Sequence, residues 1–285
     1  MKRWLKFMGA GALALSLAAC GETAEPVDNS GDKDSAGNSD LTLEELFAKT
    51  TEASGEAKSF HTDMVTNQSM TMGEGMDMEM AMDLSMDMTV DPLAFYQTGE
   101  TSFVSEEMEG MPAMKTEMYF TEEGMYTYEP TMDMWMKLPG QDMEELKTLM
   151  DQQSGDVSQQ LEDLEAFKDD FSFEQSGDEY ILKLNAAGEE YQELINDQMG
   201  QMLGEMEMEA QDALEGMTIN KVYYEIFIDK ETFLPNTMNI DMDFDMEVEG
   251  ETMNIKTDLQ SEYSKYNEIE AITVPAEVIE QAQEI

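Results

Sequence analysis

Cysteine, histidine and basic side chains are scarce in this sequence. Its 285 residues include one cysteine, Cys20, one histidine, His61, and 15 lysines and arginines. A single cysteine excludes a disulfide within the chain and a cysteine-based metal site. A catalytic Ser-His or Cys-His pair would have to use His61, which lies at the start of a predicted strand and is interpreted as a surface or rim residue. No G-x-S-x-G motif or glycine-rich phosphate loop occurs, so we expect a protein that is not an enzyme.

The chain has far fewer basic than acidic residues. The 64 Asp and Glu residues against 15 Lys and Arg give a net charge of −49. Such a surface repels phosphate backbones and anionic headgroups, which excludes nucleic acid as a partner and membrane binding through a basic patch. Acidic residues occur in every segment, so the charge predicts a uniformly solvated surface whose self-repulsion is relieved by salt.

The N-terminus combines positive charge with a short apolar run. Lys2, Arg3 and Lys6 precede this run, which ends in "LAAC" at Cys20. The run is too short for a permanent transmembrane helix and is typical of a secretory signal. "LAAC" resembles the lipobox of bacterial lipoproteins, which implies removal of residues 1–19 and acylation of Cys20, for example with palmitate. Two or three acyl chains would anchor the protein at the extracytoplasmic face of the cell membrane. A plain secretory signal with an unmodified cysteine is the alternative.

Composition divides the chain into three regions. Residues 1–19 are the predicted lipoprotein signal peptide, residues 20–40 the lipidated cysteine with a flexible acidic linker, and residues 41–285 a single domain. The linker is rich in Gly, Ser, Asp and Asn, and Val27 is its one large apolar residue, so we expect a tether. The domain, at about 245 residues, is near the upper size for one core.

Hydrophobic periodicity predicts an α+β domain. A helix over 41–57 opens it, because "TLEE" at 42–45 fits a capping box. Two more helical regions are predicted at 141–168 and 186–215. Strands are predicted at 60–72, 76–90, 93–104, 113–120, 124–129, 132–138, 171–175 and 179–184, and as a three-stranded meander over 220–263 with turns at 229–235 and 249–251.

Two of the predicted strands alternate apolar with acidic residues. The stretch 76–90 reads "MDMEMAMDLSMDMTV", and residues 238–248 read "MNIDMDFDMEV". Side chains alternate across a strand, so each segment has one apolar and one acidic face. The acidic face accounts for the charge of the protein without a ligand.

The order of these elements resembles a known superfamily. "IDKETFLPNTMNI" at 228–240 is similar to a strand, D-x-x-T-x-x-P turn and strand of the LolA/LppX/LprG-like lipoproteins, and "MYTYEPTMDMWMKLP" at 125–139 to their paired strands ending in a Trp near a Lys. The resemblance covers residues 41–275. It implies a strongly curved antiparallel β-sheet, a half-barrel, with helices covering a concave face that holds acyl chains of lipids or lipoproteins. The apolar face of this chain is rich in methionine rather than in Leu, Ile, Phe and Val.

Methionine is the most unusual component, with 30 residues, 17 of them between Met64 and Met136. One interpretation is that methionine lines a core or cavity, because Leu84 and Val90 continue the same row and methionine adapts to varied apolar partners. A second is a Cu(I) site, since thioethers favour soft metals, but sulfurs two residues apart in one strand are too far apart without a partner strand. A third is scavenging of oxidants.

These observations lead to three functional hypotheses. The first is a membrane-anchored lipoprotein that binds a lipid or acyl chain in a methionine-lined cavity, with no cofactor and no resident metal. The alternatives are a Cu(I)-binding metal-tolerance lipoprotein and a structural or signalling envelope lipoprotein without a small ligand, and no partner protein is indicated. The candidate cavity-lining residues are Met76, Met78, Met80, Met82, Leu84, Met86, Met88, Met238, Ile240, Met242, Phe244 and Met246.

Overall fold

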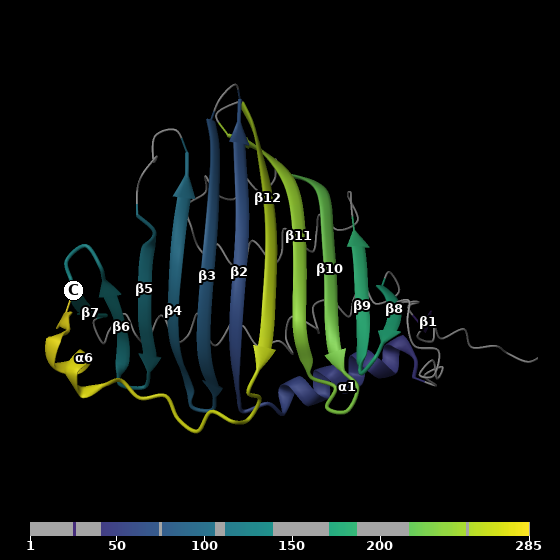
Figure 1. Cartoon of the computed structure of the whole chain (residues 1–285), viewed down its shortest axis with the longest axis horizontal. Coiled ribbons are helices and arrows are strands. Elements are labelled where there is room, and N and C mark those ends of the chain that lie inside the picture. The colour runs from purple at the N-terminus through teal and green to yellow at the C-terminus, as the bar shows by residue number, and fades with distance from the viewer. Residues whose placement is uncertain are drawn as a thin grey trace, which may run out of the picture.

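The protein is described by a computed structural model in which, among the described residues, one large and mainly antiparallel sheet carries the two helices α1 and α6 (Figure 1). Residues 1–19, most of the predicted linker and most of the predicted helical regions 141–168 and 186–215 lie outside the described residues. The helices predicted to cover the concave face thus lie outside the described residues. The structure describes residues 25–26, 41–73, 76–105, 112–138, 171–186, 217–248 and 251–284.

Thirteen strands form an open, curved sheet in the order β1-β8-β9-β10-β11-β12-β2-β3-β4-β5-β6-β7-β13. Neighbours are antiparallel except the end pairs β1–β8 and β7–β13, which are parallel. Pairing of β12 with β2 joins two meanders into one sheet. The strands are β1 (Glu25–Pro26), β2 (Ser59–Met72), β3 (Met76–Val90), β4 (Leu93–Val104), β5 (Met114–Thr121), β6 (Gly124–Glu129), β7 (Met134–Lys137), β8 (Phe171–Ser176), β9 (Glu179–Ala186), β10 (Thr218–Asp229), β11 (Pro235–Val248), β12 (Glu251–Ser264) and β13 (Gln283–Glu284).

The helix α1 (Leu43–Gly55) begins where the sequence predicts it. The Thr42 hydroxyl accepts a hydrogen bond from the Glu45 backbone N–H at 3.2 Å, and the Glu45 carboxylate accepts one from the Thr42 N–H at 3.0 Å. This reciprocal pair satisfies two N–H groups that the first turn leaves without a helical partner. The predicted capping box is therefore confirmed.

The main core lies between α1 and the strands β8 to β11. Leu46 and Phe47 of α1 are fully buried, and the Phe47 ring meets that of Phe171 edge-on at a centroid distance of 5.3 Å. On the sheet side the core includes Leu182 and Ile226, both fully buried. In Figure 1 α1 crosses behind the lower ends of these strands. Burial of this apolar area anchors one half of the sheet to the helix.

A second, smaller core lies at the other end and on the opposite face of the sheet. The helix α6 (Ala276–Gln281) packs Val278 against Tyr126 and Trp135, and Val274 joins the same cluster. Tyr126 pairs across β5 and β4 with residues of the acidic face, so α6 lies on that face. The sequence gives no prediction of α6, whose six residues are too few for a periodic signal.

Candidate functional site

The strand register places both predicted methionine rows on one face of the sheet. Met80 of β3 pairs with Gln68 of β2, Gln68 with Thr257 of β12, and Thr257 with Met242 of β11. Directly paired residues project to the same side of an antiparallel sheet, so these positions share a face. The twelve candidate residues named from the sequence therefore occupy one apolar face, with seven in the β3 row and five in the β11 row, and β12 and β2 separate the two rows.

The β11 row is packed. Met238 is 1% exposed and belongs to the core under α1. Ile240, Met242, Phe244 and Met246 are partly buried and pack against the same core. This part of the predicted lining is therefore side-chain packing inside the protein.

The β3 row is packed only toward one end. Met86 and Met88 contact a small cluster formed by Phe95 and Phe120, whose rings stack at 5.2 Å. The residues from Met78 to Leu84 are partly buried, and within the described residues they belong to none of the packed clusters. Among the described residues, this central part of β3 is the candidate for an apolar binding surface.

Between the two rows runs a line of polar side chains that the sequence reasoning did not single out. Thr62 and Thr66 of β2 and Thr257 and Ser261 of β12 are buried on the apolar face. The Gln68 amide donates a hydrogen bond to the Thr257 hydroxyl at 3.1 Å. The signal was present, because these β2 residues have the same parity as the methionines of that strand. We call Thr62, Thr66, Gln68, Thr257 and Ser261 the polar line.

Thr62 is the most unusual member of the polar line. The residue is 2% exposed, and its hydroxyl has no hydrogen-bond partner in the described structure. A buried hydroxyl without a partner costs about 1–3 kcal/mol. Nearby, burial raises the pKa of Tyr263, and a hydrogen bond with Ser261 opposes the rise.

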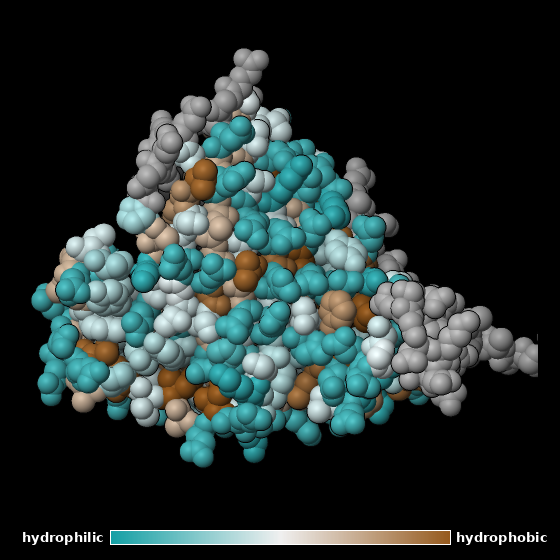
Figure 2. Space-filling view, viewed as in Figure 1, coloured by the Kyte–Doolittle hydropathy of each residue, from teal (hydrophilic) through white to brown (hydrophobic). Residues whose placement is uncertain are grey.

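The opposite face of the sheet is acidic and solvated, as the sequence predicts. Figure 2 shows this face, on which hydrophilic side chains predominate. Asp77, Glu79 and Asp83 of β3 are exposed there. The carboxylates of the two alternating strands therefore lie on the acidic face.

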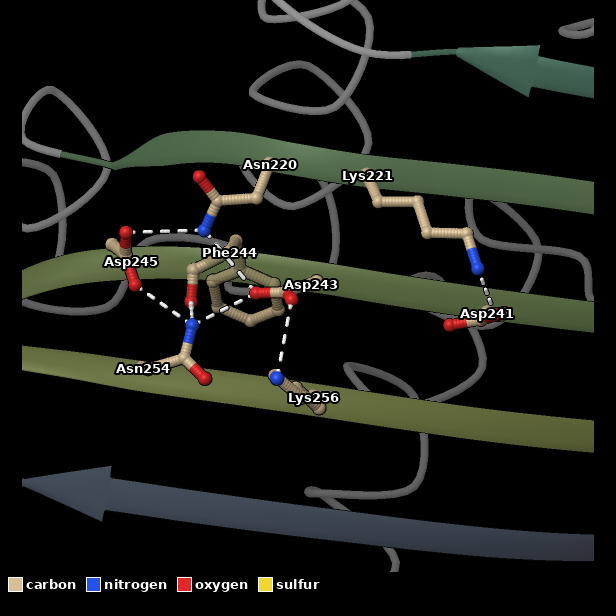
Figure 3. A network of polar contacts seen from close by, with 8 residues as sticks. All are labelled: Asn220, Lys221, Asp241, Asp243, Phe244, Asp245, Asn254 and Lys256. Carbon is tan, nitrogen blue, oxygen red and sulfur yellow. Dashed lines mark hydrogen bonds and ion pairs between the residues drawn. The ribbon is translucent and has the colours of Figure 1, made fainter.

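Amide groups hold the carboxylates of β11 on this acidic face (Figure 3). The Asn254 amide donates to Asp243 and to Asp245, each at 2.8 Å, and Asn220 donates to the same two carboxylates at 3.2 and 3.0 Å. Burial would raise the pKa of Asp243, but the hydrogen bonds from Asn254 and Asn220 and the charge of Lys256 outweigh it and lower that pKa. In a chain with few lysines, these two asparagines supply the hydrogen-bond donors that stabilise the carboxylates.

Lysines complete this network in part. Lys221 contacts Asp241 directly, and the Lys256 ammonium lies 3.5 Å from the Asp243 carboxylate. On the neighbouring strand β9, Lys183 bridges Glu174 at 2.8 Å and Glu225 at 3.5 Å. These three lysines thus pair with four carboxylates of the neighbouring strands.

His61 lies on the acidic face between two carboxylates. Its Nδ1 is 2.6 Å from Asp87, and its Nε2 is 3.2 Å from Asp63. A hydrogen bond with Ser85 and the charge of His61 lower the pKa of Asp63 against the effect of burial. The His61 side chain is 15% exposed, so the residue is more enclosed than a rim residue. Both ring nitrogens contact carboxylates, which gives His61 a cross-strand linking role.

A shallow hollow of about 330 Å³ lies on the acidic face. The small side chains of Ser69, Ala81 and Ser102 form its floor across β2, β3 and β4, and Asp241 and Lys256 line it from β11 and β12. It is on the face opposite to the methionine rows. It is therefore a separate feature from the predicted cavity.

Neither a cluster of metal-binding side chains nor a membrane-spanning helix occurs among the described residues. No group of three or more His, Cys, Asp or Glu side chains is placed so that it could hold a metal ion. No helix among these residues has the length and apolar character needed to cross a membrane. The apolar face remains the best candidate for a functional site.

Several solved structures are similar to this chain. They include LprF from Mycobacterium bovis (11% identity, 82% of this chain and 97% of LprF covered, TM-score 0.39) and a LolA superfamily protein from Nitrosomonas europaea (11%, 84% and 97%, 0.20). A phycobiliprotein lyase from Guillardia theta is also similar (8%, 79% and 94%, 0.21). LprF and the LolA superfamily protein bear names from the superfamily that the sequence resembles, and their identities and TM-scores to this chain are low.

The sequence itself matches a protein family over most of its length. No curated protein matches the chain. Residues 42–283, which include all described strands except β1 and the end of β13, match the family described as "Family of unknown function (DUF6612)". The chain belongs to this family.

Proposed function

We propose that this protein is a lipoprotein, anchored by Cys20 at the extracytoplasmic face of the cell membrane, that binds the alkyl chain of a lipid on its apolar sheet face without catalysing a reaction. The observation that carries the proposal is the central part of β3, from Met78 to Leu84. Its apolar side chains lie on one face of an open sheet, outside the packed clusters of the described residues.

Burial of hydrocarbon supplies the binding energy in this proposal. Each methylene removed from water contributes about 0.8 kcal/mol, so a chain of ten methylenes gives a gross gain of about 8 kcal/mol before the cost of ordering the ligand. Methionine suits such a surface, because its flexible thioether adapts to alkyl chains of varied shape. No nucleophile or cofactor is needed.

The polar line narrows the ligand to an amphipathic lipid. Thr62, Thr66 and Gln68 lie on β2, directly beside the β3 row, and the Thr62 hydroxyl has no hydrogen-bond partner among the described residues. An ester, carboxyl or hydroxyl group joined to an alkyl chain would satisfy this hydroxyl while its chain covers β3. A pure hydrocarbon would leave it without a partner.

The test compares two neighbouring residues on opposite faces of β3. Met82→Asp places a carboxylate on the apolar face, and Ala81→Asp places one on the acidic face. Full-length protein purified from membranes is extracted with organic solvent, and the released lipid is quantified by mass spectrometry. We expect about one lipid per wild-type chain, a loss of more than 10-fold in Met82→Asp, and no change in Ala81→Asp. Intact-mass measurement of the same samples reports the acylation of Cys20.

Four results would each contradict a part of the proposal. Wild-type protein that never releases a non-covalent lipid would remove the binding function. Equal loss in both variants would indicate general destabilisation. Loss in Ala81→Asp alone would place the ligand in the hollow of the acidic face, which Ala81 lines. An intact mass without acyl chains would remove the anchor.

A further inference from the structure

Methionines of four strands, β11, β12, β2 and β3, meet at one end of the apolar face. In one cross-strand row Met246 pairs with Met253, Met253 with Met72, and Met72 with Met76. In the next row Met70 pairs with Met78. This end is the upper one in Figure 1, where β2 and β11 end and β3 and β12 begin.

The pairing is not what a methionine-rich core produces by chance along the sheet. Elsewhere in the described register, methionines face other residue types, such as Gln68 opposite Met80 and Thr66 opposite Met82. Every direct methionine–methionine pair of the described strands lies in the two rows at this end. Met70, Met72, Met78 and Met253 are partly buried and belong to none of the packed clusters in the described residues, whereas Met238 is 1% exposed in the core.

The spacing suits thioethers that share one ion. Directly paired residues have Cβ atoms about 4.5–5.5 Å apart, and residues two apart on one strand are about 6.6 Å apart. Met72 and Met70 on β2 therefore lie between Met253 on β12 and Met78 on β3. The long methionine side chain lets sulfurs from three strands converge, which one strand alone could not provide.

We propose that Met70, Met72, Met78 and Met253 form a binding site for a soft monovalent metal ion, Cu(I) or Ag(I). Thioethers prefer Cu(I), whereas the surrounding carboxylates prefer hard cations and do not compete for it. The charge of −49 raises the local concentration of any cation near the surface. Metal binding at this site needs no lipid, so it can be tested independently of the proposed lipid binding.

Ag(I), which is not redox-active under these conditions, is the probe for the test. The full chain is titrated with Ag(I) in competition with a chromogenic chelator, in wild type, in Met72→Leu/Met253→Leu and in the control Met86→Leu/Met88→Leu. We expect the first pair of substitutions to remove one high-affinity equivalent, a loss of at least 10-fold in affinity, and the control pair to change nothing. Leucine for methionine nearly conserves volume, and thermal unfolding checks that both variants fold.

A second readout separates thioethers from other ligands. A thioether carries no proton in this range, so its affinity for Ag(I) should stay constant from pH 5 to pH 8. An imidazole ligand would lose affinity toward pH 5, and His61 lies 11 residues from Met72 along β2, about 35 Å away. Absence of a high-affinity equivalent in wild type, equal losses in both variants, or a steep loss of affinity toward pH 5 would each overturn the proposal.

Discussion

The strands β3 and β11 have the same alternation of apolar and acidic residues but different surroundings. The apolar side chains of β11 pack with α1 and β8 to β10, and Met238 is fully buried there. Those in the middle of β3 are partly buried and join no packed cluster of the described residues. The alternation therefore determines which face a side chain occupies, and the neighbouring elements determine whether that face is packed.

The acidic sides of the two strands differ as well. On β11, Asp243 and Asp245 each receive hydrogen bonds from Asn220 and Asn254. On β3, Asp77 and Glu79 are exposed. The strand with the packed apolar side is thus also the one whose carboxylates are held by amides, so both sides contribute to the rigidity of β11.

The largest expected difference is in the cost of truncating methionine. Met238→Ala leaves a cavity in the core under α1 and should lower the free energy of unfolding by about 3 kcal/mol. Met82→Ala, on the partly exposed row of β3, should cost about 1 kcal/mol, because little packing is lost. Urea unfolding followed by circular dichroism measures both. Equal costs would mean that the β3 row is as tightly packed as the β11 row.

Much of the fold could be predicted from the sequence, because strands with strict alternation carry a strong local signal. The predicted strands 76–90, 93–104 and 124–129 have the observed bounds, and most of the others agree within about two residues. The pairing of β12 with β2 could not be read from the pattern, since register between segments far apart in the chain depends on packing. The closing elements α6 and β13 were missed because they are short.

For the candidate site too, the sequence predicts the strand face of each residue but not its packing. The twelve apolar residues were assigned correctly to shared strand faces, because parity is local. Their division into a packed β11 row and a less packed β3 row depends largely on α1, β8 and β9, which are distant in sequence from β11. The β2 members of the polar line share the parity of the methionines of that strand, so the pattern could have shown them, whereas the methionine pairs arise between strands and a pattern within one strand could not show them.

An intermediate effect is expected from the amides that hold the β11 carboxylates. Asn254→Leu removes donors from Asp243 and Asp245 and should lower stability at pH 7 by about 1–2 kcal/mol. The folded-state pKa of Asp243 is lowered, so its contribution is present above the unfolded pKa of about 3.9 and is lost as the pH falls through the folded value. The gap between wild type and variant should therefore close below about pH 4.

Urea unfolding at pH 7, 5 and 3 measures this gap. Asn67→Leu is a suitable control, because Asn67 is exposed on the same face of β2, opposite Ala81 of β3. We expect the control to change stability by less than about 0.5 kcal/mol at every pH. A gap for Asn254→Leu that stays constant down to pH 3 would show that the amide acts by packing rather than through the charge of the carboxylates.

The smallest expected effect has the opposite sign and concerns the strand beside β3. Thr62→Val removes a buried hydroxyl that has no partner in the described structure, at nearly constant volume, so stability without ligand should rise by about 0.5–1 kcal/mol. In the control Thr89→Val, the lost hydroxyl donates to the Pro92 carbonyl at 2.9 Å, and stability should fall by about 1 kcal/mol.

The same Thr62→Val variant links stability to binding. If Thr62 serves only folding, Thr62→Val should lower the stability of the protein and leave lipid retention unaltered. A hydroxyl kept for a lipid's polar group would give a more stable protein that retains about 3- to 10-fold less lipid, since one hydrogen bond is worth about 0.5–1.5 kcal/mol. Thermal unfolding of delipidated protein, paired with lipid quantification, decides between them, because only the second case moves the two measurements in opposite directions.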